Sequence, residues 1–396
     1  MSLIKEWKTL NKNKNAIFKP QKKIGRKILK EFLLNRLIVT LCTPPQWGKT
    51  GTSLFVGYHM CNLVKKDKKI SHQNVYFITG MSDLSWIQQT KERVLPLWKQ
   101  NVYHRNTLHK LRDRLLELKR DNKYQNTLFI IDECHIANNN RHTLGSLLRI
   151  LEINDPTLLQ KNNIRILQIS ATPSNALVDA EQWGKYHSKI IPTISPEYVS
   201  FQTMKHEKRL HNLYDLMDSQ EVEDFSKHIL KYDEEKYHFI RSVCKGPRGS
   251  IKYKIIKDNL FSLCEKYNFK LLELNGTKSQ EEKQSIYDNL YKKPDCHTLI
   301  LIKDMLGASK TLPDKYIGCV HESNPNKKSF SSEVQGLPGR FCGWTKKKGK
   351  GAPEVFCRKD ILDSYQSLYK SKFDLESEGI MWDDARMKLR ADGKLS

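Results

Sequence analysis

Short apolar runs alternate with longer amphipathic stretches along this chain of 396 residues. In the first series the strand-like runs lie at 36–42, 74–79, 127–131 and 164–169, and a helical stretch at 50–64 follows the first of them. Apolar runs of this length are typical of strands that are buried on both faces, and intervening helices indicate βαβ units. The pattern therefore predicts an α/β fold built on a parallel sheet.

A second series of the same kind follows after residue 232. Its strand-like runs lie at 237–243, 269–274, 297–302 and 316–321, and a helix is expected at 251–267. Two such series indicate two α/β lobes in tandem. Two lobes of this kind offer a natural cleft between them.

The stretch between the two series is polar and highly charged. We expect it to form a linker or a small helical insert at 196–232. This divides the chain into an N-terminal domain at 1–195, a second α/β domain at 233–372 and a C-terminal tail at 373–396, where no core pattern is visible.

The composition is strongly basic, with 68 Lys and Arg residues against 44 Asp and Glu residues and a formal net charge of +24. Such a balance favours a polyanionic partner, and nucleic acid before a membrane surface. A generally basic proteome or a solubility bias is the alternative explanation. No apolar run approaches the roughly 20 residues that span a bilayer, so no membrane segment is expected.

The nine cysteines are scattered and never form a Cys-x-x-Cys pair. Their odd number and spacing argue against a disulfide framework or a zinc ribbon. The first residues are charged too early for a secretion signal. We therefore expect an intracellular, reducing compartment, either cytoplasm or nucleus.

A loop with the sequence Thr-Pro-Pro-Gln-Trp-Gly-Lys-Thr follows the first strand and precedes a helix. Backbone N–H groups at such a helix start form an anion site. Lys49 would reach the β- and γ-phosphates of a nucleotide, and the Thr50 hydroxyl would ligate Mg²⁺. A full P-loop has Gly where Thr43 stands, so an ordinary βα turn is the alternative. The candidate nucleotide-binding residues here are Pro45, Gln46, Trp47, Gly48, Lys49, Thr50 and Gly51.

The apolar run at 127–131 leads directly into Asp132, Glu133, Cys134 and His135. Two carboxylates at the end of a buried strand are unfavourable unless a cation lies beside them. Together with the phosphate loop, they indicate that Asp132 holds Mg²⁺ through water and that Glu133 orients and deprotonates the attacking water. His135 is a candidate relay. The alternative is a polar loop in which His135 caps the next helix.

The segments 48–50, 132–135 and 170–173 together resemble motifs I, II and III of the DExH-type superfamily 2 helicases. The resemblance covers roughly residues 21–369, and its compact form is similar to helicases of phages and large DNA viruses. It implies two tandem RecA-like P-loop domains with parallel sheets and an ATP cleft between them, with ATP and Mg²⁺ as cofactors. It also implies that Thr172 links the ATP site to the strand-binding face.

The segment at 335–340 resembles motif VI of the same family but departs from it, because Gly336 stands where the first Arg is expected. Arg340 is the candidate arginine finger that stabilises charge on the transferring phosphoryl group, and Gln335 belongs to the same motif. A surface arginine in a Gly/Pro loop is the alternative. Gln21 occupies the place where the family often has a glutamine that reads adenine, although a solvated loop glutamine fits equally well.

The expected track for nucleic acid follows from the same resemblance. The segment that begins at Thr79 and Gly80 looks like motif Ia, whose backbone contacts phosphates, and the segment that begins at Lys303 looks like a divergent motif V. Trp86 would either stack on a base or pack beneath its own helix. The candidate nucleic-acid residues are Thr79, Gly80, Trp86, Arg105, Thr172, Lys303 and Thr311.

These features indicate an ATP-dependent helicase or translocase that moves along or unwinds nucleic acid, with DNA favoured over RNA. One alternative is a duplex translocase that drives a nuclease or packaging complex. Another is a nucleic-acid-binding module with a degenerate ATP site, and an unrelated P-loop kinase would not explain the second lobe. Replication, repair or nuclease proteins are candidate partners.

Overall fold

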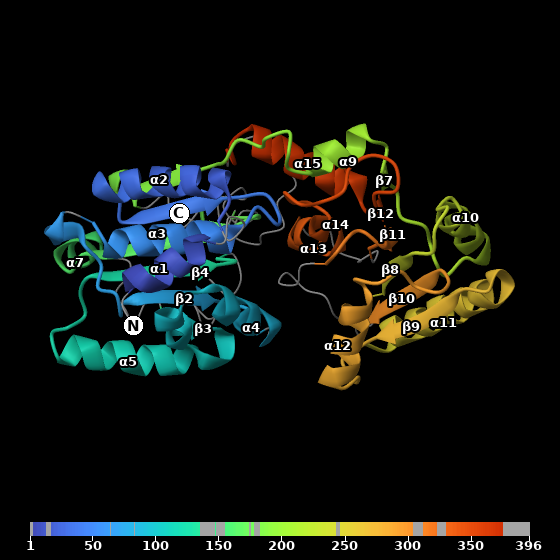
Figure 1. Cartoon of the computed structure of the whole chain (residues 1–396), viewed down its shortest axis with the longest axis horizontal. Coiled ribbons are helices and arrows are strands. Elements are labelled where there is room, and N and C mark those ends of the chain that lie inside the picture. The colour runs from blue at the N-terminus through green and yellow to red at the C-terminus, as the bar shows by residue number, and fades with distance from the viewer. Residues whose placement is uncertain are drawn as a thin grey trace. The chain divides into compact units, whose positions relative to one another are not determined.

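The chain divides into two compact units, with the boundary between Thr193 and Ile194. Figure 1 shows the elements of both units, and each unit is described by itself. The computed structural model describes residues 3–12, 17–63, 65–82, 84–134, 147, 155–173, 176–177, 183–242, 246–303, 312–322 and 330–374.

The first unit is built on a parallel six-stranded sheet in the order β3-β2-β4-β5-β1-β6. The four strands predicted from apolar runs are confirmed, whereas β3 and β6 are short edge strands that were not expected. The strands are β1 (Ile38–Cys42), β2 (Val75–Thr79), β3 (Val102–Tyr103), β4 (Thr127–Asp132), β5 (Ile164–Ser170) and β6 (His187–Ile190).

Helices cover both faces of this sheet, as expected for the strands β1, β2, β4 and β5, in which every residue except Asp132 is buried. The helices α2 and α3 run side by side (Figure 1). The described helices are α1 (Leu3–Lys12), α2 (Lys19–Leu33), α3 (Lys49–Cys61), α4 (Leu84–Arg93), α5 (Leu108–Arg120) and α7 (Pro156–Lys161), with short 3₁₀ turns at Lys66–Lys68, Pro96–Asn101, Arg105–Thr107 and Gly184–Tyr186.

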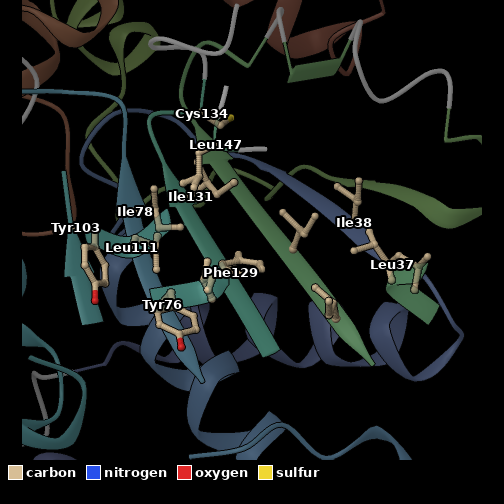
Figure 2. Packing of buried hydrophobic residues seen from close by; sticks show 14 of the residues in the cluster. Leu37, Ile38, Tyr76, Ile78, Tyr103, Leu111, Phe129, Ile131, Cys134 and Leu147 are labelled. Atoms are coloured by element: carbon tan, nitrogen blue, oxygen red, sulfur yellow. The ribbon is translucent and has the colours of Figure 1, made fainter. Parts of the chain in front are cut away.

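Alternate residues of the strands form one core against α5 and α7. Figure 2 shows Tyr76, Ile78, Phe129 and Ile131 pointing to the same side of β2 and β4, where they meet Leu111 of α5. The intervening residues of these strands are buried as well. Burial on both faces explains why the strands are almost continuously apolar and why the sequence predicted them.

The second unit contains a second parallel six-stranded sheet, in the order β7-β12-β11-β8-β10-β9. The four predicted strands of this unit are confirmed, and β7 and β12 are additional. The strands are β7 (Leu210–His211), β8 (Tyr237–Ser242), β9 (Lys270–Leu274), β10 (Thr298–Lys303), β11 (Ile317–His321) and β12 (Glu354–Phe356).

The helices of the second unit include the helix expected at 251–267, which begins earlier. The helices α9 and α15 contact each other although they are far apart in the sequence. The helices are α9 (Phe201–His206), α10 (Ser219–Ile229), α11 (Gly246–Tyr267), α12 (Gln280–Asn289), α13 (Phe330–Gln335), α14 (Leu337–Arg340) and α15 (Lys359–Lys370).

The stretch at 196–232, expected to be a linker or a small helical insert, lies in the second unit and contains the helices α9 and α10. It supplies β7 to the sheet, and Leu216, Phe225 and Ile229 join the hydrophobic core. Few but regularly placed apolar residues on α10 are enough to bury one side of the helix.

The expected C-terminal tail begins later than residue 373, because Phe373 is fully buried and packs against Tyr369. Residues 375–396 lie outside the described residues. Eight cysteines fall within the described part of the chain, and all eight are free thiols. None of the helices described here combines the length and the apolar character needed to cross a membrane.

The Glu333 side chain on α13 predicts a pH dependence of stability. Its burial, with a smaller effect of the nearby Glu322 charge, raises the pKa of Glu333 to about 8. The folded chain therefore keeps a proton that the unfolded chain releases near pH 4.5. The contribution of Glu333 to the free energy of unfolding is complete below that pH and is lost as the pH rises through about 8. The loss is roughly 1.4 kcal/mol for each unit by which the pKa differs between the folded and unfolded chains.

Glu333→Gln should remove this loss. In urea denaturation at pH 5 and pH 8, the variant should gain stability relative to wild type as the pH rises. Glu265→Gln, at an exposed position on α11, is the control and should show the wild-type pH dependence. A Glu333→Gln variant with the wild-type dependence would contradict the burial of a protonated carboxyl.

Candidate nucleotide-binding site

The carboxyl ends of β1, β4 and β5 lie at one edge of the first sheet. Cys42 is level with Ser170, and Asp132 is level with Ile169. Ligands of parallel α/β sheets bind outside the carboxyl ends of the strands. The chain therefore brings the loop after β1, the carboxylates after β4 and the Ser-Ala-Thr segment after β5 to the edge where a ligand is expected.

The loop after β1 leads into α3 through a glycine in the left-handed region. Thr43 anchors the start of the loop, since its N–H donates to the Ser170 carbonyl at 3.0 Å. Gly48 has φ +97° and is the N-cap of α3, and it has no side chain to cap the helix. The first-turn N–H groups, together with the positive end of the helix dipole, are therefore suited to an anion.

Gln21 of α2 packs directly on this loop. Its Nε2 donates to the Gly48 carbonyl at 2.9 Å, and its Oε1 accepts from the Phe18 N–H at 2.7 Å. A Cβ at Gly48 would lie 1.7 Å from Gln21 Nε2, and one at Gly51 would lie 2.5 Å from Gln21 Oε1. Both glycines thus make room for Gln21, whose amide contacts protein groups on both sides in this structure.

An ionic cluster occupies the centre of the site. The Lys49 ammonium contacts the Glu133 carboxylate directly and lies 3.4 Å from Asp132 Oδ1. Burial alone would lower the pKa of Lys49, but the charges of Asp132 and Glu133 outweigh it and hold the pKa above its ordinary value. Lys49 is therefore a fixed cation on the first residue of α3.

Asp132 and Glu133 are held by their own local contacts. The Glu133 backbone has φ +51°, an uncommon value for a residue other than glycine. Its N–H donates to Asp132 Oδ1 at 3.1 Å, and Trp86 Nε1 donates to Asp132 Oδ2 at 2.9 Å. Positive φ at a buried acidic residue is a conformation that clusters at functional sites.

The residues at this edge fit a magnesium nucleotide by their chemistry. One ammonium faces two carboxylates, so the cluster carries a net negative charge that a divalent cation would balance. Asp132 and the hydroxyl of the partly exposed Thr50 are oxygen ligands of the kind that Mg²⁺ prefers. A small pocket beside them is lined by Lys49, Thr50, Ser53, Phe77, Trp86, Thr90, Ile130 and Asp132.

Several residues predicted to contact nucleic acid also lie at this edge. Thr79 and Gly80 are buried at the end of β2, and the Arg105 N–H donates to the Met81 carbonyl at 2.9 Å, which brings the exposed Arg105 beside them. Thr172 follows β5, and its N–H donates to Ser170 Oγ at 3.0 Å.

Trp86 packs beneath its own helix, α4, which is the second of the two roles considered for it. Its side chain is 5% exposed, and its indole N–H bonds to Asp132. A ring buried in this way offers no open face on which a base could stack. The geometry therefore favours packing within the unit over base stacking. Its position does connect α4 to the acidic end of β4, a contact that the sequence did not reveal.

The candidate residues of motifs V and VI belong to the second part of the chain. Arg340 is 1% exposed, and its Nη2 donates to the Gln335 carbonyl at 3.1 Å, which places the two motif VI candidates together. Lys303 ends β10 with its ammonium 4.9 Å from the centre of the Tyr253 ring. His135 and Thr311 lie outside the described residues.

Sequence reasoning missed Glu322, which follows β11. Its carboxylate accepts two bonds from Arg241 Nη1, at 2.9 and 3.2 Å, and one from the Leu337 N–H at 2.9 Å. It thereby ties the end of β8 to the start of α14, the helix that carries Arg340. An apolar strand that ends in two adjacent carboxylates was the signal used for Asp132 and Glu133. Here an apolar strand leads through His321 to one carboxylate, which is a weaker form of that signal.

The two units together have the fold of tandem RecA-like helicase domains. A solved structure of the DEAD-box helicase Mss116 bound to single-stranded RNA and UDP-BeF is similar over 96% of this chain and 81% of its own, with 16% identity and a TM-score of 0.51. A structure of Mss116p (NTE and C-tail double deletion) bound to single-stranded RNA and AMP-PNP covers 91% and 74%, with 14% identity and a TM-score of 0.50.

At these identities the likeness shows the fold alone. No family model matches the sequence. No curated protein matches it either. The assignment of the site therefore depends on the residues and contacts described above.

Gly48→Ala tests the geometry of the loop. The added methyl group would collide with Gln21, and the alanine would have to adopt the unfavourable φ of +97°. We therefore expect the loop to rearrange and the affinity for nucleotide to fall by at least about tenfold, or about 1.4 kcal/mol. Titration with a fluorescent ATP analogue measures this loss.

Gly184→Ala is a matched control, because Gly184 has φ +45° and open space around its Cβ position. It should lose a similar amount of thermal stability from backbone strain and still bind nucleotide like wild type. Equal nucleotide binding by the wild type and Gly48→Ala would show that the loop does not form the site.

Proposed function

We propose that this protein is a nucleic-acid-dependent ATPase of the DExH helicase type, which uses Mg²⁺ and ATP to move along or unwind DNA. The single observation that carries the proposal is the cluster of Lys49, Asp132 and Glu133, placed by a P-loop-like turn at the carboxyl edge of a RecA-like sheet. A turn without a nucleotide role would not need a cation and two carboxylates brought together at a helix start.

Lys49 and the first turn of α3 are proposed to hold the β- and γ-phosphates. Thr50 and Asp132 would hold Mg²⁺, which supplies positive charge to the phosphate oxygens during transfer. The ammonium of Lys49 then exchanges its carboxylate partners for phosphate oxygens. Glu133, released from this ion pair, becomes available as the base that takes a proton from the attacking water.

Arg340 is the proposed arginine finger, with Gln335 beside it. In the described structure the Arg340 guanidinium donates to the Gln335 carbonyl. As the finger, it would place its positive charge beside the transferring phosphoryl group during turnover. Glu322 would act as a positioning residue, since it fixes the N–H of Leu337 at the start of α14.

Nucleic acid is proposed to contact Thr79, Gly80, Arg105 and Thr172 of the first unit, and Lys303 and Thr311 are the candidate contacts from the second part of the chain. The net charge of +24 supports a polyanionic track. Contacts through backbone N–H groups and arginine predict binding that depends on salt and little on base sequence. We favour DNA as the track.

Steady-state ATPase activity with different tracks tests the proposal. We expect hydrolysis by wild type to be stimulated several-fold by single-stranded or duplex DNA, with weaker stimulation by single-stranded RNA, and to decline as salt rises. Stronger stimulation by RNA than by DNA would identify RNA as the track and contradict the choice of DNA. No hydrolysis by the folded protein with any of the three would contradict an ATP-driven motor.

Glu133→Gln tests the proposed base. The amide cannot accept the proton, so turnover should fall by at least about 100-fold, the usual contribution of a general base, while nucleotide binding is retained. Glu117→Gln, at an exposed position on α5, should have wild-type turnover. A Glu133→Gln variant that still hydrolyses ATP would exclude Glu133 as the base.

A further inference from the structure

A cluster of His211, His228 and Glu354 lies in the second unit. His211 belongs to β7, His228 to α10 and Glu354 to β12. One nitrogen of each imidazole and one carboxylate oxygen all lie within 4.8 Å of one another. We propose that these three residues bind a divalent transition-metal ion, for which Zn²⁺ is the first candidate.

The donor set matches this chemistry. Two imidazole nitrogens and one carboxylate oxygen suit zinc and neighbouring first-row ions better than Mg²⁺ or Ca²⁺, which prefer oxygen alone. Ligand bonds of about 2.0–2.2 Å in a tetrahedral arrangement place ligand atoms about 3.3–3.6 Å apart. Glu354 Oε2 lies 3.2 Å from His211 Nε2 and 2.6 Å from His228 Nδ1, so small side-chain movements would suffice.

The surrounding residues hold these ligands in place. Phe356 packs against both imidazoles, with ring centres 4.8 Å from His211 and 4.9 Å from His228. The hydroxyl of Tyr214 lies 3.2 Å from His228 Nε2. A partner on the second nitrogen fixes the ring and leaves Nδ1 to the metal, which is the usual arrangement around metal-bound histidines.

Without a metal ion, His228 donates from Nδ1 to Glu354 Oε2 at 2.6 Å, and an ion that binds here would replace this proton. The Lys231 ammonium lies 3.3 Å from the same nitrogen. Lys231 is exposed and on a flexible stem, so it can leave when a metal ion binds. The three ligands are partly buried, which leaves solvent access for an ion and for a water molecule as its fourth ligand.

Metal binding here would join distant parts of the second unit. His228 and Glu354 are 126 residues apart in the sequence, and β7 is an edge strand of only two residues. A clip that closes a long loop restricts the unfolded chain most. The proposed ion would therefore stabilise the attachment of β7 and α10 to β12, independently of the nucleotide site in the first unit.

Zinc titration of the full chain tests the proposal. The protein is stripped with EDTA and titrated with Zn²⁺ against a chromophoric chelator, in excess Mg²⁺ to saturate oxygen-only sites. Wild type should bind one Zn²⁺ per chain and gain thermal stability from it. Glu354→Gln and His228→Gln should each bind at least about tenfold more weakly, since loss of even an outer partner costs 10–100-fold.

Two controls separate this site from general binding by histidines or thiols. His206→Gln, at an exposed position on α9, should keep wild-type zinc affinity, and Lys231→Ala, which removes the competing ammonium, should bind zinc at least as tightly as wild type. Co²⁺ in place of Zn²⁺ should give ligand-field bands without a thiolate-to-cobalt charge-transfer band. Should either ligand variant fail to fold, Tyr214→Phe removes only the outer hydrogen bond and should weaken zinc binding by about tenfold.

Three outcomes would overturn the proposal. Wild type that binds no Zn²⁺ would show that the cluster is held by hydrogen bonds alone. Stoichiometric zinc that is unaffected by both ligand variants would place the ion elsewhere, and a thiolate spectrum would assign it to cysteines.

Discussion

The ion pair between Lys49 and the two carboxylates at the end of β4 is the interaction on which the site depends. Charges that leave water need compensation, and the two carboxylates stabilise the charged form of Lys49. The same groups are those that a magnesium triphosphate would need, with a cation for phosphate and oxygen ligands for the metal. The cluster is therefore a resting arrangement that binding would reorganise by exchanging partners.

The sheet explains why these groups meet. β1 and β4 are separated by β5, and in-register parallel pairing brings their carboxyl ends level. Gln21 then packs against the loop after β1 and donates to the Gly48 carbonyl, in space that Gly48 and Gly51 leave open. In the second unit Glu322 plays a comparable structural part, since it joins β8 to the helix that carries Arg340. Each unit thus fixes its candidate residues by buried polar contacts within its own fold.

The long strands were predictable because a strand buried on both faces must be largely apolar, as in residues 128–131 of β4. The edge strands β3, β6 and β7 bury fewer residues and left no such pattern. The sequence could place Lys49 in a loop after an apolar strand and Asp132 and Glu133 at the end of another, and the roles of these residues stay predictions. The contacts of Trp86 with Asp132 and of Gln21 with Gly48 arise from packing of separate segments, and no local pattern reports them.

The most direct test of this account is the equilibrium affinity of Lys49→Ala for a fluorescent ATP analogue in the presence of Mg²⁺. A charged hydrogen bond contributes about 1.5–3 kcal/mol, so the variant should bind at least about tenfold more weakly than wild type. Lys91→Ala, at an exposed position on α4, should bind like wild type. Unchanged affinity in Lys49→Ala would contradict the claim that this ion cluster is the nucleotide site.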